Sequence, residues 1–172
     1  MRDRRIRLVL AVIVVAMVGV GVAMAATRST SAKNGTVRTA KVGKFGTVLV
    51  AANGMTLYRY TPDKKNVSVC NGACAGYWPP LLVKGTAKPT VGSGASASLL
   101  GTTMRTGGAE QVTYAGFPLY YYAGDKKPGQ ANGQGFERTW YVVSATGALV
   151  KHAVAASGSG GTTKKKSGSA WG

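Results

Sequence analysis

Two short segments of the chain share the pattern Tyr-x-Tyr-x-x-Asp. They read YRYTPD at residues 58–63 and YYYAGD at residues 120–125. Because residues i and i+2 of a strand share a face, both tyrosines of each segment are expected on one side of a sheet. The aspartate then follows a turn that Thr-Pro or Ala-Gly marks. The pattern predicts two copies of one β-structured unit.

The similarity extends beyond these segments when the chain is aligned with itself at an offset of 62 residues. Without any gap, Gly46, Val50, Gly54, Leu57, Tyr58, Tyr60, Asp63, Lys64, Lys65, Trp78 and Gly85 fall on Gly108, Val112, Gly116, Leu119, Tyr120, Tyr122, Asp125, Lys126, Lys127, Trp140 and Gly147. A fixed offset of this kind is the signature of an internal repeat. The chain therefore carries a tandem duplication, with repeats at about residues 43–85 and 105–147.

Each repeat is expected to hold three strands, because its apolar residues alternate with a period of two and are mostly branched or aromatic. The expected strands are 47–52, 55–60 and 78–83 in the first repeat and 111–114, 117–122 and 140–143 in the second. Asn53-Gly54 between two such runs is a strong hairpin signal. No stretch after Ala26 has a helical stripe.

The fold class that follows is all-β. The two three-stranded units are expected to pack, with a pseudo-twofold relation, as one small sandwich or partly open barrel over residues 43–154. Residues 26–42 are expected to be a linker and a first strand. Residues 155–172 are expected to form a flexible, basic Gly/Ser/Lys tail.

The first 25 residues have the pattern of a secretory signal peptide, with four arginines before an uncharged apolar run from Leu8 to Ala26. The alternative is an uncleaved anchor in which residues 8–26 contact the membrane, because this run is just long enough to span a bilayer. In both cases the rest of the chain is expected to be exported. It is then either secreted or attached to the outer face of the cytoplasmic membrane.

Cys70 and Cys74 lie in the segment CNGAC, and an oxidising compartment favours a disulfide between them. A redox-active pair and a metal or free-thiol site are the open alternatives. The single histidine, His152, excludes the HExxH zinc motif and any His-based triad that does not use it. We therefore expect no cofactor, no metal site and no catalytic residues.

The chain has 22 Lys+Arg against 5 Asp+Glu, a formal net charge of +17. Such a charge favours anionic partners, which outside the membrane are an envelope polymer or a phospholipid surface. No specific nucleic acid is expected as a partner.

After the signal region the only aspartates are Asp63 and Asp125, so each carboxylate is expected to have a specific task. A structural task is to accept backbone N–H bonds or to pair with the adjacent lysines. A functional task is a ligand or metal site shared with the tyrosine hydroxyls. The motif residues that are candidates for binding are Tyr58, Tyr60, Asp63, Lys64, Lys65, Tyr120, Tyr122, Asp125, Lys126 and Lys127. Trp78 and Trp140 are expected to be core anchors, because a bulky aromatic ring buries a large apolar area.

These features resemble the bacterial secreted repeat family, also described as lipoprotein repeats with a Yx(FWY)xxD motif. The resemblance rests on both motif copies, the CNGAC segment followed by Trp78-Pro79-Pro80-Leu81, and the export signal, and it spans about residues 43–150. It implies an envelope or extracellular protein whose biochemical function is not established. Many members look lipid-anchored through an N-terminal Cys, which this chain lacks, and its second repeat has Asn132 and Phe136 in place of the Cys pair.

Three hypotheses about function follow. The first is a non-catalytic envelope module that binds an anionic or carbohydrate-rich partner. The second is a redox or metal-handling envelope protein that uses the Cys pair and the Tyr/Asp motifs. The third is a hydrolase in which Asp63 and Asp125 form a carboxylate pair, as glycoside hydrolysis requires.

Overall fold

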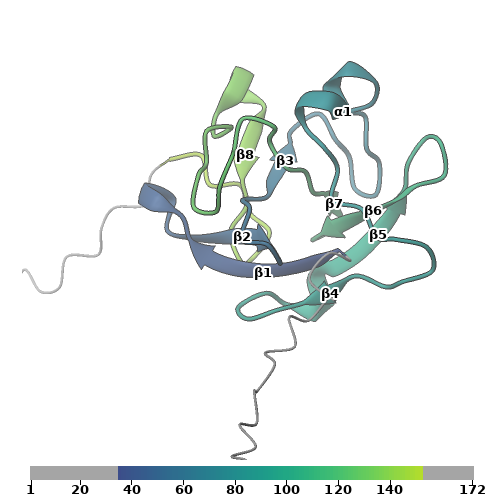
Figure 1. Cartoon of the computed structure of the whole chain (residues 1–172), viewed down its shortest axis with the longest axis horizontal. Coiled ribbons are helices and arrows are strands. Elements are labelled where there is room, and N and C mark those ends of the chain that lie inside the picture. Colours follow the sequence, from purple (N-terminus) through teal and green to yellow (C-terminus); the bar gives the residue numbers. More distant parts are fainter. Residues whose placement is uncertain (1–34, 153–172) are drawn as a thin grey trace, which may run out of the picture.

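The computed structural model describes residues 35–152 (Figure 1). The expected signal peptide or anchor at residues 1–25 and the expected tail at residues 155–172 lie outside this range. Within residues 35–152, no helix combines the length and the apolar character that crossing a membrane requires.

The described chain is mostly strands with one short helix, so the all-β prediction is confirmed. The strands are β1 (Thr36–Lys41), β2 (Thr47–Ala51), β3 (Tyr58–Tyr60), β4 (Thr90–Val91), β5 (Leu100–Met104), β6 (Glu110–Tyr114), β7 (Phe117–Pro118) and β8 (Trp140–Val142), and the helix is α1 (Ala73–Tyr77). They form three small sheets, ordered β2-β1-β4, β3-β8 and β5-β6-β7, and none of these sheets of the described chain closes into a barrel.

Strand β2 lies between two hydrophobic cores, which explains its unbroken apolar run. Leu49 packs in a core with Leu57, Val112 and Leu119, whereas its neighbours Val48 and Val50 pack in a second core around the tryptophans. Alternate side chains of a strand point to opposite faces, so a strand that is covered on both faces must be apolar throughout. The cores are therefore separated by the paired strands β1 and β2.

The two repeats are joined by backbone pairing between their motif segments. Tyr58 and Tyr120 exchange backbone hydrogen bonds, with N to O distances of 2.9 and 3.0 Å. On one side Tyr120 bridges Pro80, and on the other side Tyr58 pairs with Val142. These outer partners are equivalent under the 62-residue offset, and each pairs with the motif strand of the other repeat. A pseudo-twofold axis thus passes between Tyr58 and Tyr120.

The remaining differences from the expected strands have local causes. Segment 78–83 forms only single bridges at Pro80 and Leu82, because two successive prolines lack the N–H groups that a ladder needs. Segment 55–60 is a strand only from Tyr58, and segment 117–122 is a strand only at Phe117–Pro118. Between β6 and β7, Ala115 and Gly116 both have positive φ angles (52° and 81°), as a two-residue hairpin turn requires.

Three elements were not expected from the sequence. Helix α1 has five residues, which is too short to show a helical period. Strand β4 adds two residues in parallel to β1, and strand β5 lies before the start expected for the second repeat. Strand β5 pairs with β6 as β1 pairs with β2, so each repeat begins with a hairpin.

Candidate functional site

The two motif aspartates are exchanged between the repeats. The Tyr58 hydroxyl donates to Oδ2 of Asp125 (2.6 Å), and the Tyr120 hydroxyl donates to Oδ2 of Asp63 (2.7 Å). We refer to these two contacts as the Tyr–Asp bridges. Each bridge joins the first tyrosine of one motif to the aspartate of the other, so the bridges tie the two repeats together across the axis.

The second oxygen of each carboxylate is also occupied. Oδ1 of Asp63 accepts the backbone N–H of Val69, and Oδ1 of Asp125 accepts that of Asn132, both at 2.8 Å. The two aspartates are only 5% and 6% exposed. Their partners are a phenol and a backbone amide rather than the neighbouring lysines, so both carboxylates are engaged in holding the fold.

Burial governs the ionisation of the Tyr–Asp bridges. Loss of solvent raises the pKa of Tyr58 and of Tyr120 well above 10, and the hydrogen-bonded carboxylates add to this effect. Burial also raises the pKa of Asp63, although the hydrogen bonds from Tyr120 and Val69 oppose that shift. At neutral pH the phenols therefore remain protonated donors.

The second tyrosine of each motif joins a column of four rings in the order Tyr60, Trp140, Trp78, Tyr122, which we call the aromatic stack. The ring centroids are 4.2, 3.9 and 4.4 Å apart along this column. The two indole planes are parallel to within 1°. Both tryptophans are buried, and the motif tyrosines Tyr58 and Tyr120 meet them edge-on at 5.4 and 5.1 Å.

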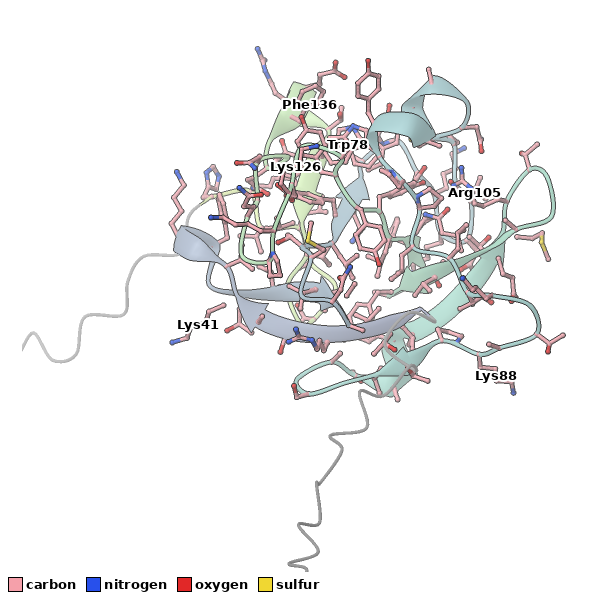
Figure 2. The ribbon with its side chains drawn as sticks, in the orientation of Figure 1. Lys41, Trp78, Lys88, Arg105, Lys126 and Phe136 are labelled. Carbon is pink, nitrogen blue, oxygen red and sulfur yellow. A yellow bond between two sulfur atoms is a disulfide. The ribbon has the colours of Figure 1, made fainter. Side chains whose placement is uncertain are left out.

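One side of the aromatic stack borders a cleft of about 410 Å³, the aromatic cleft. Its lining residues are Tyr60, Cys74, Tyr77, Trp78, Tyr122, Phe136, Glu137 and Trp140. Figure 2 places Trp78 and Phe136 at the same end of the molecule, beside helix α1. Three pairs of these residues are equivalent under the 62-residue offset: Tyr60 with Tyr122, Cys74 with Phe136, and Trp78 with Trp140. The cleft therefore lies at the pseudo-twofold axis and needs both repeats.

The disulfide between Cys70 and Cys74 shapes one wall of the aromatic cleft, and the expected pairing is confirmed. The two Cα atoms are 5.3 Å apart. Cys74 lies within helix α1, whose last residue, Tyr77, is 70% exposed and lines the cleft. The ring thus fixes the segment that leads into Trp78.

Arg105, which directly follows strand β5, binds the loop that carries the disulfide. Its guanidinium donates to Oγ of Ser68 (2.6 Å), the carbonyl oxygen of Cys70 (2.6 Å) and Oδ1 of Asn71 (2.9 Å). It also donates to Oε1 of Gln111 at 2.6 Å, and the side chain is buried. A planar fork with several donors suits this cluster of acceptors.

The four motif lysines lie on exposed turns whose first residues are held near the aromatic cleft, but none of the four lines it. Backbone hydrogen bonds of 2.8 Å join Ala123 to Tyr77 and Thr61 to Thr139, so each turn is held against a segment at the cleft. Lys126 and Lys127 follow the first of these contacts, and Lys64 and Lys65 follow the second. All four side chains are exposed.

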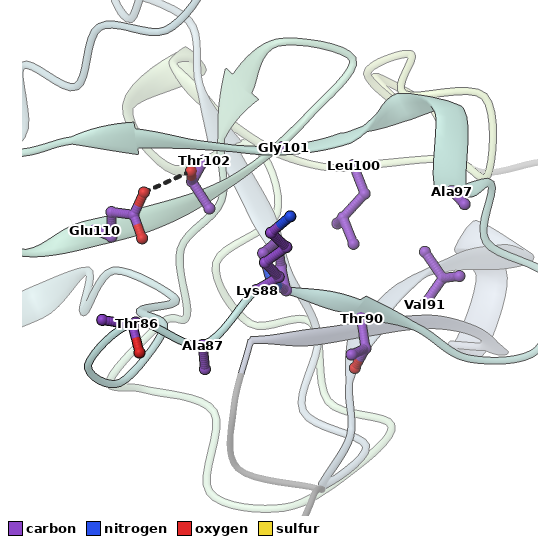
Figure 3. A pocket seen from close by; sticks show the side chains of 11 residues that line it. Thr86, Ala87, Lys88, Thr90, Val91, Ala97, Leu100, Gly101, Thr102 and Glu110 are labelled. Atoms are coloured by element: carbon purple, nitrogen blue, oxygen red, sulfur yellow. Dashed lines mark hydrogen bonds between the residues drawn. The ribbon is translucent and has the colours of Figure 1, made fainter.

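A second, larger cavity of about 740 Å³ lies between the segment before β4 and strand β5 (Figure 3). Among residues 35–152, Lys88 and Glu110 are its only charged lining residues, and the Glu110 carboxylate accepts the Thr102 hydroxyl at 2.9 Å. No aromatic side chain from this part of the chain lines it. Most of its lining belongs to the connection between the repeats, so it does not share the symmetry of the aromatic cleft.

Among residues 35–152, no three His, Cys, Asp or Glu side chains come close enough together to hold a metal ion. The metal alternative for the Cys pair therefore gains no ligand cluster from the described part of the chain.

Comparison with known proteins gives one match. A family model described as a secreted repeat of unknown function matches residues 39–82 and 101–144, two copies displaced by the same 62 residues. Together the copies cover just over half of the chain. The chain belongs to this family. No curated protein and no solved structure matches the chain.

In this member of the secreted repeat family, the two tyrosines of each motif have different places. The first tyrosine forms a Tyr–Asp bridge, and the second enters the aromatic stack. The description of the family as secreted agrees with the expectation that the chain is exported.

Four residues of the site were missed by reasoning from the sequence: Tyr77, Phe136, Glu137 and Arg105. Tyr77 and Glu137 have no equivalent in the other repeat, so the self-alignment could not single them out. Phe136 carried a usable signal, because it occupies the position of Cys74 in the second repeat. Arg105 lies in the hairpin that was not expected, and nothing in its sequence context marks it.

Proposed function

We propose that this protein is an exported, non-catalytic module that binds an anionic, carbohydrate-rich envelope polymer in the aromatic cleft. The observation that carries the proposal is that both repeats contribute equivalent residues to one concave, aromatic-lined site. Such a site is the usual form of a binding pocket. The duplication then has a purpose, because one repeat supplies only half of the cleft.

The aromatic surface supports a ligand with flat apolar faces, such as a sugar ring. Tyr77 and Phe136 are 70% and 42% exposed, which is high for large aromatic side chains. Rigid aromatic rings provide contact area at a low cost in conformational entropy. The parallel stack behind them keeps Trp78 and Trp140 in fixed positions, so the cleft is preformed.

The positive charge around the cleft supports an anionic polymer. Lys64 and Lys65 follow the turn that begins at Thr61, and Lys126 and Lys127 follow the turn that begins at Ala123, so both pairs lie outside the cleft lining. Exposed charges of one sign attract an oppositely charged ligand and speed its association, and added salt weakens that attraction. A polymer has to extend beyond the cleft to meet both pairs.

The state of the two motif aspartates supports binding rather than hydrolysis. Both carboxylates are buried, and all four of their oxygens accept hydrogen bonds from the protein. A carboxylate that acts as a nucleophile or a general acid must reach the substrate. Asp63 and Asp125 are thus better explained as the ties between the repeats.

The proposal is tested by measuring binding of the full exported chain to polygalacturonate at several salt concentrations. Neutral dextran serves as the uncharged carbohydrate, and phosphatidylglycerol vesicles serve as the lipid surface. We expect salt-dependent binding to polygalacturonate that exceeds binding to both comparison ligands. Equal binding to the vesicles would instead favour the phospholipid surface, and a lack of binding to any anionic ligand would overturn the proposal.

Matched variants locate the binding site. Tyr77→Ala with Phe136→Ala is expected to weaken binding by roughly tenfold, because exposed aromatic anchors dominate such contacts. The control pair is Val67→Ala with Met104→Ala, two exposed apolar residues that do not line the cleft. Equal losses of polymer affinity in both variant pairs would mean that the polymer does not bind in the aromatic cleft.

A second matched comparison tests the charge. Lys64→Glu with Lys126→Glu is expected to weaken binding and to flatten its salt dependence. Lys41→Glu with Lys88→Glu changes the net charge by the same amount at positions far from the cleft (Figure 2). Similar losses for both pairs would mean that net charge alone, and not the lysines beside the cleft, attracts the polymer.

A further inference from the structure

The Tyr–Asp bridges and the aromatic stack form one continuous cluster. Tyr58 touches Trp78 edge-on, Tyr120 touches Trp140 in the same way, and the two tryptophans lie face to face at 3.9 Å. Each of these buried phenols has a carboxylate oxygen at 2.6 or 2.7 Å. The arrangement that holds the two repeats together therefore also places oxidisable rings beside proton acceptors.

Tyrosine and tryptophan are the side chains that give up one electron most readily. An oxidised phenol is a strong acid, so it loses its proton at once if an acceptor lies within hydrogen-bond distance. Proton transfer to a positioned base needs a separation of about 2.6–3.2 Å between heavy atoms. Both Tyr–Asp bridges meet this condition.

The aromatic stack provides a path to these phenols from the cleft. Its outer rings, Tyr60 and Tyr122, are only half-buried and line the cleft, whereas the two indoles are buried. Parallel rings in contact share a positive charge over both π systems, which stabilises the oxidised state. A charge introduced at Tyr60 or Tyr122 can therefore reach Tyr58 and Tyr120 through ring contacts alone.

We propose that this cluster is a one-electron redox site that intercepts oxygen-centred radicals of the peroxyl class. The radical takes one electron from the aromatic stack and becomes a peroxide anion. The electron is replaced from Tyr58 or Tyr120, whose O–H bond breaks as its proton passes to Oδ2 of Asp125 or Asp63. The products are a neutral tyrosyl radical hydrogen-bonded to a carboxylic acid, and the peroxide anion takes a proton from water. This activity is independent of polymer binding.

The ionisation of the groups in the resting protein fits this step. Burial keeps the pKa of Tyr58 and Tyr120 raised, so both phenols hold their protons until the ring is oxidised. Burial also raises the pKa of Asp63, which favours uptake of a proton by that carboxylate. The proton stays within the bridge when it moves from the phenol to the carboxylate. The net charge of the pair therefore differs from its resting value only by the one electron that was removed.

The test is flash oxidation of the full chain by photogenerated ruthenium(III) tris-bipyridine, followed by transient absorption and electron paramagnetic resonance. The unmodified protein is expected to form an indole radical first and then a neutral tyrosyl radical, with a solvent deuterium isotope effect on the second step. A tyrosyl radical that forms without an isotope effect, or an indole radical that never passes to tyrosine, would overturn the proposal.

Variants identify the proton acceptors. Asp63→Asn with Asp125→Asn removes both bases and keeps one acceptor oxygen in each side chain, and it is expected to slow tyrosyl formation by roughly tenfold or more. Tyr58→Phe with Tyr120→Phe is expected to abolish the long-lived tyrosyl signal and leave the indole radical. This second pair provides the same test if the asparagine variant does not fold.

Two other tyrosines serve as controls. Tyr114 is buried and donates to the neutral carbonyl of Ala145 at 2.9 Å, and Tyr141, which does not line the cleft, donates to the carbonyl of Arg138 at 3.0 Å. Tyr114→Phe and Tyr141→Phe are each expected to leave the tyrosyl signal unchanged. Loss of the signal in either control would mean that the radical forms on the control tyrosine and not on Tyr58 or Tyr120, which would contradict the proposal.

Discussion

Trp78 and Trp140 lie face to face, with 3.9 Å between ring centroids and 1° between ring planes. They are equivalent residues of two tandem repeats, both are buried, and each covers one face of the other. A single repeat would expose its indole and lose a large part of its apolar burial. The stack thus couples the stability of the fold to the presence of both repeats.

The close contact of the backbone with this stack gives a first prediction. A Cβ atom at Gly133 would lie 2.6 Å from Cη2 of Trp78, so Gly133→Ala must displace the indole. We expect a loss of about 1–3 kcal/mol in the free energy of unfolding, as for overpacked cores. Urea unfolding and near-ultraviolet circular dichroism measure the effect.

The matched control for this change is Gly76→Ala in helix α1, where a Cβ meets nothing within 4 Å. Alanine has the higher helix propensity, so this variant is expected to be neutral or slightly more stable. If Gly133→Ala left the free energy of unfolding unchanged as well, the close contact between the Gly133 backbone and Trp78 would be contradicted.

Much of the fold could be predicted from the sequence, because the duplication repeats its own signals. The turn around Asn53-Gly54, which Ala51 and Met55 close, strand β8 and the disulfide all follow from local patterns. The exchange of Asp63 and Asp125 between repeats does not. Strand geometry places the tyrosines of one motif on a shared face, but it does not say which carboxylate they meet.

The parts of the candidate site that escaped prediction are those without a repeated counterpart. Tyr77 lies at the end of a five-residue helix, too short to give a periodic pattern. Arg105 acts through four acceptors, three of which, on Ser68, Cys70 and Asn71, lie 34 to 37 residues away in sequence. Contacts of this kind depend on how loops meet in three dimensions, and propensity does not encode that.

Arg105 gives a second prediction. Arg105→Lys retains the charge but replaces a planar fork with a single ammonium group, which cannot reach all four acceptors. We expect a loss of about 1–3 kcal/mol in the free energy of unfolding, because buried acceptors are left without donors. Arg138→Lys, at an exposed position, is the control and is expected to have little effect. Equal effects of the two changes would show that the buried contacts of Arg105 contribute nothing to the free energy of unfolding.

The disulfide gives a third prediction, which separates stability from binding. The ring closed by Cys70 and Cys74 is short, so its removal in Cys70→Ser with Cys74→Ser should cost about 2 kcal/mol or less in the free energy of unfolding. Because Cys74 lines the aromatic cleft, polymer binding should weaken more than the loss of stability alone explains. Calorimetry and binding under conditions where the variant stays folded check both parts. Unchanged binding would exclude a role for the disulfide in shaping the cleft.

A fourth prediction concerns alkaline pH. Below about pH 10, Tyr58 and Tyr120 are protonated in the folded and unfolded states, so their contribution to stability is fully present. Above that pH the unfolded chain loses these protons while the buried phenols keep theirs, because burial raises their pKa. The free energy of unfolding should then fall by up to about 1.4 kcal/mol per pH unit for each phenol.

Tyrosinate absorbance during an alkaline titration checks this behaviour. The two buried phenols should ionise only as the protein unfolds, because burial raises their pKa. In Tyr58→Phe with Tyr120→Phe, the fall in stability with pH should become shallower. Ionisation of all tyrosines before unfolding would contradict the buried state of the Tyr–Asp bridges.

The exchange of hydrogen bonds between the repeats is tested most directly by two double-mutant cycles on the free energy of unfolding. Tyr58→Phe is combined with Asp125→Asn in one cycle and with Asp63→Asn in the other. We predict a coupling energy of about 0.5–3 kcal/mol for Tyr58 with Asp125, its partner in the other repeat, and additive effects for Tyr58 with Asp63 in its own motif. Coupling to Asp63 and additivity with Asp125 would contradict the exchange, and with it the view that the two repeats share one site.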